Sequence, residues 1–172
     1  MNKRITLKCS SFDVSLRTIA KTDLENLRQW KNTHRFSFFF QDLISSEQQS
    51  AWFEGYLGRP NDYMLMIINK GHPIGCLGFR LQNGTADVYN VILGNPALGK
   101  RGLMSQAMQL MCSYIATNFT HTIVAQVLTN NPAIEWYNKN GFYENLRHDT
   151  YVEMELDMAK FSTCHVTLSE QE

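Results

Sequence analysis

The sequence lacks several features that would place it at once in a broad class of protein. Its four cysteines form no C-x-x-C pair and its five histidines never fall at metal-ligand spacing, which argues against a disulfide scaffold and a metal site. Sixteen basic residues balance sixteen acidic ones, so no overall charge favours nucleic acid or an anionic membrane. The longest apolar run, YMLMII at 63–68, is too short to span a bilayer, and no secretory segment follows MNKR. We therefore expect a cytoplasmic chain with reduced thiols that binds neither nucleic acid nor membrane.

What is present fits one globular domain. A chain of 172 residues, 44% of them apolar, can bury a sizeable core, and no stretch has the composition of a linker. We expect a single domain over residues 1–160 and a polar tail over 161–172 that carries no chemistry.

Local patterns predict a mixture of helices and strands. TDLE at 22–25 and SSEQ at 45–48 have the capping-box pattern and predict two early helices, the second of which ends near Gly58 and Pro60. Short turns that contain Gly and Asn separate three predicted strands, which should therefore be antiparallel. The fold class is α+β, a three-layer arrangement with a mixed, mainly antiparallel central sheet flanked by helices. The other expected elements are an apolar stretch at 14–19, strands at 62–69, 73–81, 85–93, 122–128 and 150–158, and helices at 103–115 and within 131–142.

The stretch ALGKRGLMSQAM places Lys100 and Arg101 where a helix begins, although the partial positive charge of a helix N-terminus favours acidic residues there. A bound anion would offset the unfavourable electrostatic energy of two cations at a helix N-terminus. Gly99 and Gly102 leave room for a ligand, and the amides of residues 99–104 would point outward. The alternative is a solvated basic turn that is rich in glycine. Neither a P-loop nor a dinucleotide fingerprint is present.

A second motif, NNPAIEWYNKNGF at 130–142, follows the first, and together with the order of elements the two motifs resemble the GNAT superfamily of acetyl-CoA-dependent N-acetyltransferases. The resemblance covers residues 14–158. In that family a Q/R-x-x-G-x-G/A loop binds the pyrophosphate of coenzyme A through its amides. Gly99 replaces the usual Gln or Arg, and Met104 replaces a small residue, which should tighten the pocket. The loop residues thereby implied in coenzyme binding are Gly99, Lys100, Arg101, Gly102, Leu103, Met104 and Ser105.

The second motif supplies the candidate general acid. In the family its Asn contacts the coenzyme and its Tyr hydroxyl lies near the coenzyme sulfur, so the resemblance assigns Asn130, Ala133 and Tyr137 to the coenzyme site. A phenol can protonate the thiolate that an amine expels from a thioester, which makes Tyr137 the candidate acid. Asn131 is the rival of Asn130, and we favour Asn131 as the helix cap. By itself, Tyr137 would read as an ordinary half-buried tyrosine.

The strand at 85–93 matters for the same family reason. In GNAT proteins this strand splays from a neighbouring strand and the pantetheine arm lies in the gap, which would place it against the backbone of Val91, Ile92 and Leu93. A general base often comes from this strand, so Asp87 is the candidate base and Tyr89 a polar residue within reach of the substrate. The alternatives are that Asp87 only edges a turn and that water relays the proton.

Residues 27–53 resemble a GNAT branch of sugar-nucleotide acetyltransferases from bacterial glycan pathways, including the pseudaminic-acid route. Ribosomal-protein N-terminal acetyltransferases share parts of this pattern. We expect most phenylalanines of HRFSFFF to fill the core, although one or two could line the cleft while His34 or Arg35 meets a phosphate. The matching residues are Leu27, Arg28, Trp30, Lys31, Asn32, Ile44, Trp52 and Phe53, and the acceptor-binding candidates are Arg28, His34, Phe38 and Tyr89.

The resemblance implies transfer of an acetyl group from acetyl-CoA, with no metal, to a primary amine of a small acceptor. We expect a nucleotide-linked amino sugar of the 4-amino-4,6-dideoxy type. The alternatives are a ribosomal-protein N-terminus or a polyamine as acceptor, and a module that binds acyl-CoA without catalysis. The sequence leaves a homodimer open.

Overall fold

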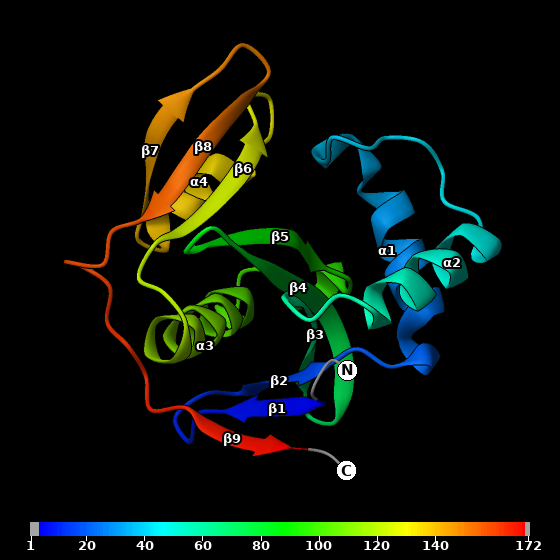
Figure 1. Cartoon of the computed structure of the whole chain (residues 1–172), viewed down its shortest axis with the longest axis horizontal. Coiled ribbons are helices and arrows are strands. Elements are labelled where there is room, and N and C mark those ends of the chain that lie inside the picture. Colours follow the sequence, from blue (N-terminus) through cyan, green and yellow to red (C-terminus); the bar gives the residue numbers. More distant parts are fainter. Residues whose placement is uncertain (1–3, 171–172) are drawn as a thin grey trace.

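One mixed sheet organises the computed structural model, which describes residues 4–170 (Figure 1). Its strands are β1 (Ile5–Lys8), β2 (Val14–Thr18), β3 (Asp62–Asn69), β4 (His72–Gln82), β5 (Thr85–Leu93), β6 (Ile123–Leu128), β7 (Phe142–Arg147), β8 (Tyr151–Leu156) and β9 (Thr167–Glu170). Their order across the sheet is β7-β8-β6-β5-β4-β3-β2-β1-β9. Within the described residues β5 and β6 are the one parallel pair, and every other neighbouring pair is antiparallel. The expected α+β class and mainly antiparallel sheet are confirmed.

In residues 4–170, four α-helices cover the two faces of the sheet: α1 (Leu24–Thr33), α2 (Ser46–Leu57), α3 (Leu103–Asn118) and α4 (Ala133–Lys139). Helices α3 and α4 share one core, and α1 and α2 build a second core on the opposite face (Figure 1). Strand β3 separates the two cores, because Met64 and Met66 pack toward α1 and α2 while Leu65 and Ile67 pack toward α3. Burial on both faces explains why this strand is a continuous apolar run.

Strands β5 and β6 are joined only where both begin. The ladder between them consists of the pairs Ala86–Ile123, Asp87–Val124 and Val88–Ala125. Beyond it β5 runs on to Leu93 and β6 to Leu128 without pairing to each other, so the two strands diverge. Asn90 has a φ of 50° at the point where the register with β4 shifts, which marks a β-bulge. The divergence opens the sheet in its middle.

The two predicted capping boxes have different outcomes. Ser45 and Gln48 form the box at the start of α2 as predicted, with each side chain bonded to the other's backbone amide. The box predicted at residues 22–25 is wrong. Asp23 instead pairs with Arg17 at 2.7 Å and accepts a hydrogen bond from the amide of Ala20, while the helix begins one residue later. Glu25, the carboxylate of the predicted box, bonds to Arg28 and Gln29 of its own helix instead of to the Thr22 amide.

Three short described strands, the edge strands β7 and β9 and the neighbouring β1, were not among the predicted elements. Strands β1 and β7 have weak apolar patterns, and β9 lies in the segment 161–172 that the sequence assigns to a polar tail. In the structure this segment returns to the sheet, where Thr167–Glu170 pairs with β1 (Figure 1). All four residues of β9 are exposed, so only the pairing partner identifies them as a strand.

Candidate active site

A cavity of about 1100 Å³ lies where β5 and β6 diverge. Helix α1, the segment 34–45 that follows it, the start of α3 and helix α4 form its other walls. Most of the residues proposed from the sequence line this cavity together: His34, Phe38, Asp87, Tyr89, Val91, Ile92, Leu93, Gly99, Lys100, Arg101, Gly102, Leu103, Met104, Ser105, Ala133 and Tyr137.

Two proposed residues lie outside the cavity. Arg28 bonds to Glu25 at 2.6 Å and to the Ile44 carbonyl, so its guanidinium braces α1 rather than facing the cavity. Asn130 is exposed, whereas Asn131 lines the wall. Asn131 Oδ1 accepts a hydrogen bond from the Ala133 amide at 2.9 Å, so Asn131 rather than Asn130 bonds to the first residue of α4, whose N-cap position is Pro132.

The candidate anion-binding loop turns tightly into α3. Lys100 has a φ of 62° and Gly102 a φ of 75°, and the helix begins at Leu103. The outward amides do not include Gly99, because its N–H donates to the Pro96 carbonyl at 3.1 Å. The first-turn amides have no acceptor within the helix, and a Cβ on Gly102 would meet nothing within 4 Å. These amides and the exposed side chains of Lys100 and Arg101 together suit an anion.

Tyr137 is held on α4 by edge-to-face contacts with Trp136 and Phe142. It is 7% exposed, and no described residue hydrogen-bonds to its hydroxyl. Burial raises the pKa of Tyr137 far above its ordinary value, and the Cys112 thiol and the Asp87 carboxylate raise it further. The phenol therefore stays protonated at neutral pH, which suits a proton donor.

Asp87 is the third residue of β5 and lies in the cavity wall, so it does not edge a turn. Burial raises the pKa of its carboxyl, the nearby Arg80 opposes this shift, and Glu153 adds to it. A raised pKa brings a carboxylate closer to the strength that a general base needs at neutral pH.

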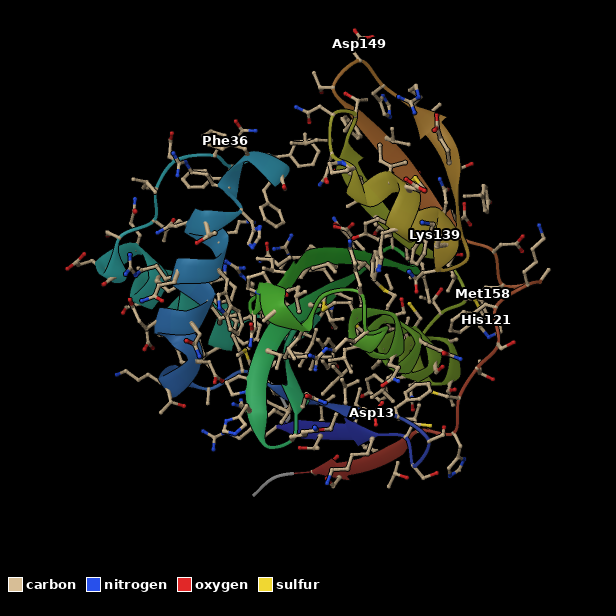
Figure 2. The ribbon with its side chains drawn as sticks, turned by 180° about the vertical axis from the view of Figure 1, so that it is seen from behind. Asp13, Phe36, His121, Lys139, Asp149 and Met158 are labelled. Carbon is tan, nitrogen blue, oxygen red and sulfur yellow. The ribbon has the colours of Figure 1, made fainter. Side chains whose placement is uncertain are left out.

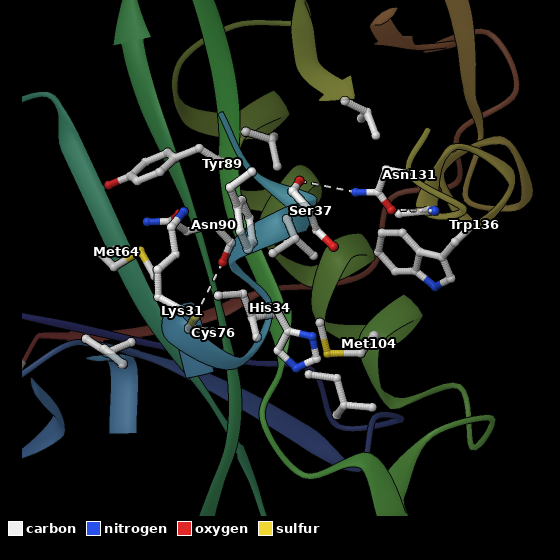
Figure 3. Close-up of a pocket in the computed structure, with 18 of the residues that line it drawn as sticks. Lys31, His34, Ser37, Met64, Cys76, Tyr89, Asn90, Met104, Asn131 and Trp136 are labelled. Atoms are coloured by element: carbon white, nitrogen blue, oxygen red, sulfur yellow. Dashed lines mark hydrogen bonds between the residues drawn. The ribbon is translucent and has the colours of Figure 1, made fainter. Parts of the chain in front are cut away.

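Lys31 is a cavity residue to which the sequence analysis gave no role in the site. Lys31 and Asn90 lie side by side in the pocket (Figure 3), and Lys31 Nζ donates to Asn90 Oδ1 at 2.6 Å. The same Nζ lies 3.4 Å from the centre of the Phe38 ring. Burial lowers the pKa of Lys31 to about 8. The signal for Lys31 in the sequence was its place among the residues that resemble the sugar-nucleotide branch. The asparagine that it contacts is 59 positions away in the chain.

A second polar cluster lies on β4 and β5. The Tyr89 hydroxyl bonds to the Asp62 carboxylate, and the Arg80 guanidinium lies 3.7 Å from the centre of the Tyr89 ring. Arg80 is also 3.5 Å from Asp62, which is buried and pairs with Arg59 as well. The charge of Arg80 is therefore largely balanced, unlike that of Lys31.

Most phenylalanines of HRFSFFF do not fill the core, contrary to expectation, and Phe38 alone among them packs against the second core. Phe36, Phe39 and Phe40 are 64%, 55% and 52% exposed, and Figure 2 shows Phe36 on the segment that leaves α1. Phe38, Phe39 and Phe40 line the cavity instead. The segment lies at the cavity mouth, where Phe39 contacts the Tyr151 ring of β8 and Phe36 and Phe40 face solvent over most of their surface.

Residues 4–170 contain no group of three or more His, Cys, Asp or Glu side chains placed to hold a metal ion. None of the helices in this range is both long and apolar enough to cross a membrane.

Comparisons with known proteins agree with this geometry. Residues 13–142 match the family model described as an acetyltransferase (GNAT) domain. No curated protein matches the sequence significantly.

Solved structures share the fold at low identity, which by itself establishes the fold alone. A spermidine N-acetyltransferase from Vibrio cholerae in complex with CoA and spermine is 18% identical, with a TM-score of 0.71 over 87% of this chain and 98% of that chain. Apo FdhC, a nucleotide-linked sugar GNAT, is 15% identical, with a TM-score of 0.74 over 94% and 93%. RimL, a ribosomal L7/L12 alpha-N-protein acetyltransferase in complex with coenzyme A, is 18% identical, with a TM-score of 0.68 over 86% and 94%. Because the family model matches residues 13–142, which is most of this chain, the chain belongs to the GNAT acetyltransferase family and is an acyltransferase.

Proposed function

We propose that this enzyme transfers acetyl from acetyl-CoA to a primary amine on an anionic small molecule, a nucleotide-linked amino sugar of the 4-amino-4,6-dideoxy type. The charge of the cavity carries the proposal. Among the described residues that line the cavity, Asp87 is the one carboxylate, against the cations Lys31, Lys100 and Arg101 and against Arg80, whose charge is shared with Asp62. An acceptor with phosphates would be attracted to this wall.

The cations serve different ends of the cavity. Lys100 and Arg101 stand beside the first-turn amides of α3, where they would add to the binding of the coenzyme pyrophosphate. Lys31 lies on α1, and its contacts are the neutral Asn90 amide and the Phe38 ring. Its charge is therefore available to an anionic acceptor and repels a polyamine.

The aromatic residues at the mouth support a nucleotide on the acceptor. Phe39 and Phe40 present more than half of their surface to solvent while lining the cavity. A base could stack on such rings, and His34 lies nearby in the same wall to meet a phosphate.

The proposed chemistry is direct attack in a ternary complex. The neutral amine nitrogen attacks the thioester carbon, a C–N bond forms, and the C–S bond breaks as the coenzyme leaves as a thiolate. Tyr137 gives its proton to the thiolate, and Asp87 takes the proton of the amine directly or through water. Backbone amides of the bulge in β5 that face the gap toward β6 would hold the pantetheine arm.

The test is thiol release from acetyl-CoA with a panel of amines: sugar nucleotides of the 4-amino-4,6-dideoxy type, ribosomal N-terminal peptides and spermidine. We expect turnover with a sugar nucleotide. Lys31→Met should raise the KM for that acceptor about tenfold, whereas Lys31→Arg, which keeps the charge, should retain most affinity. Faster turnover of spermidine or a peptide would overturn the acceptor, and no turnover with any amine would favour a binding module.

A further inference from the structure

The segment 34–45 is anchored at its base and joined to the opposite wall of the cavity. At its base, Asn32 Oδ1 accepts from the Ile44 amide at 2.8 Å and Asn32 Nδ2 donates to the Ile44 carbonyl at 2.9 Å. Across the cavity, Asn131 Nδ2 donates to the Ser37 carbonyl at 3.3 Å (Figure 3). The Phe39 ring also meets the Tyr151 ring of β8 edge to face at 5.5 Å.

These two contacts across the cavity do much to position the segment. Its large apolar side chains Phe36, Phe39, Phe40 and Leu43 are all more than half exposed. Phe38 is the one phenylalanine of the segment that packs on the second core. The rest of the segment buries little apolar surface, so individual polar and aromatic contacts do much to decide how often it is closed.

Asn131 connects the segment to the helix that carries Tyr137. Its Oδ1 caps the Ala133 amide at 2.9 Å, and its Nδ2 holds Ser37, so one planar amide fixes both partners. Ala133 lines the cavity on the coenzyme side, and His34, Ser37 and Phe38 line it on the acceptor side. Any ligand that orders the start of α4 therefore also orients the amide that closes the segment.

We propose that Asn131 is a positioning residue that couples coenzyme binding at α4 to closure of the 34–45 segment over the acceptor. By reciprocity, the closed segment strengthens coenzyme binding by the same factor by which the coenzyme favours closure. The proposal rests on the coenzyme site alone and holds whichever amine is the acceptor.

The test uses coenzyme A as the probe and needs no acceptor. Hydrogen exchange is measured for the amides of Ser37 and Phe38, which donate to the His34 and Arg35 carbonyls, and of Ile44. In the unmodified protein we expect coenzyme A to slow this exchange about three- to tenfold, the factor that one hydrogen bond supplies.

Two substitutions separate the two roles of Asn131. Asn131→Ser and Asn131→Asp both keep an oxygen that can cap α4 but lose the N–H that reaches Ser37. In both variants coenzyme A should no longer slow hydrogen exchange in the 34–45 segment. The Kd of coenzyme A should rise by at most about three- to tenfold, and hydrogen exchange in α4 should stay unchanged. The serine variant controls for the negative charge of the aspartate variant.

Tyr151→Ala is the matched control at the second contact. It removes the ring that meets Phe39 without touching α4, so the segment should exchange faster while coenzyme A still slows it. The proposal is overturned if coenzyme A leaves the segment unaffected in the unmodified protein, or if its effect survives in Asn131→Ser. Because neither outcome involves an amine, both are independent of the acceptor panel.

Discussion

At the scale of single residues, Tyr137 is the group on which the proposed chemistry depends most. Its hydroxyl is buried in the cavity wall with a raised pKa, so it is protonated throughout the neutral range. Tyr137→Phe removes one oxygen and keeps the ring contacts with Trp136 and Phe142. We expect kcat to fall about 10²- to 10⁴-fold, as for other lost general acids, with the Kd of acetyl-CoA unchanged in calorimetry. A kcat within threefold of the unmodified enzyme would remove Tyr137 from the mechanism.

Asp87 should leave its signature in the pH dependence of the rate. Because burial raises the pKa of its carboxyl, protonation begins at a higher pH than for an exposed aspartate. A base must be ionised to act, so kcat/KM should fall as pH falls through this raised pKa. The isosteric Asp87→Asn should lower the rate and remove that acid limb. An unchanged acid limb in this variant would assign it to another group, such as the amine itself.

At the scale of elements, the start of α3 should bind the coenzyme mainly through its backbone. Lys100 and Arg101 are exposed, and their charges act through solvent. We expect Lys100→Ala with Arg101→Ala to weaken coenzyme A binding about threefold at low salt and to flatten its salt dependence. Lys160→Ala, an exposed lysine paired with Asp157 outside the cavity, is the control. Unchanged binding at low salt would show that the two cations do not contribute to coenzyme binding.

Elements with local signals could be predicted from the sequence. The strands at 62–69 and 85–93 have the predicted bounds, because a continuous apolar run and turn residues mark them on both sides. The cap at Ser45 depends on Gln48, three residues away. The box predicted between Thr22 and Glu25 does not form, because the Glu25 carboxylate bonds to Arg28 and Gln29 instead. Strand β9 was missed because its partner β1 is more than 150 positions away.

The residues of the candidate site also divide into those that a local motif predicts and those that only contacts between distant residues bring into the cavity. The motif residues from Gly99 to Ser105 and Tyr137 meet in one cavity as the resemblance implied. The contact of Lys31 spans 59 positions and that of Asn131 with Ser37 spans 94. Contacts over such separations are set by how the two cores pack on the sheet, which no local pattern encodes. The acceptor side of the site was therefore the least predictable part.

At the scale of the whole molecule, the cavity lies in the middle of the sheet. The two edge strands of the sheet are β7 and β9. The β9 edge is fastened by contacts with the α3 core. Cys164 donates its amide to Ser113 Oγ at 3.0 Å, and Phe161 and Val166 pack on the core. None of these described residues lines the cavity. Stability and ligand binding should therefore be separable at this edge.

Deleting the residues after Lys160 tests this separation. The deletion exposes the edge of β1 and removes part of the cover over α3, while the walls formed by β5, β6 and α4 stay intact. We expect the free energy of unfolding to fall by about 2 kcal/mol, which lowers the unfolding midpoint by roughly 4–8 °C in a domain of this size. The Kd of coenzyme A should stay within twofold at a temperature where both proteins are folded. Weaker binding under that condition would show that the β9 edge positions the cavity as well as stabilising the fold.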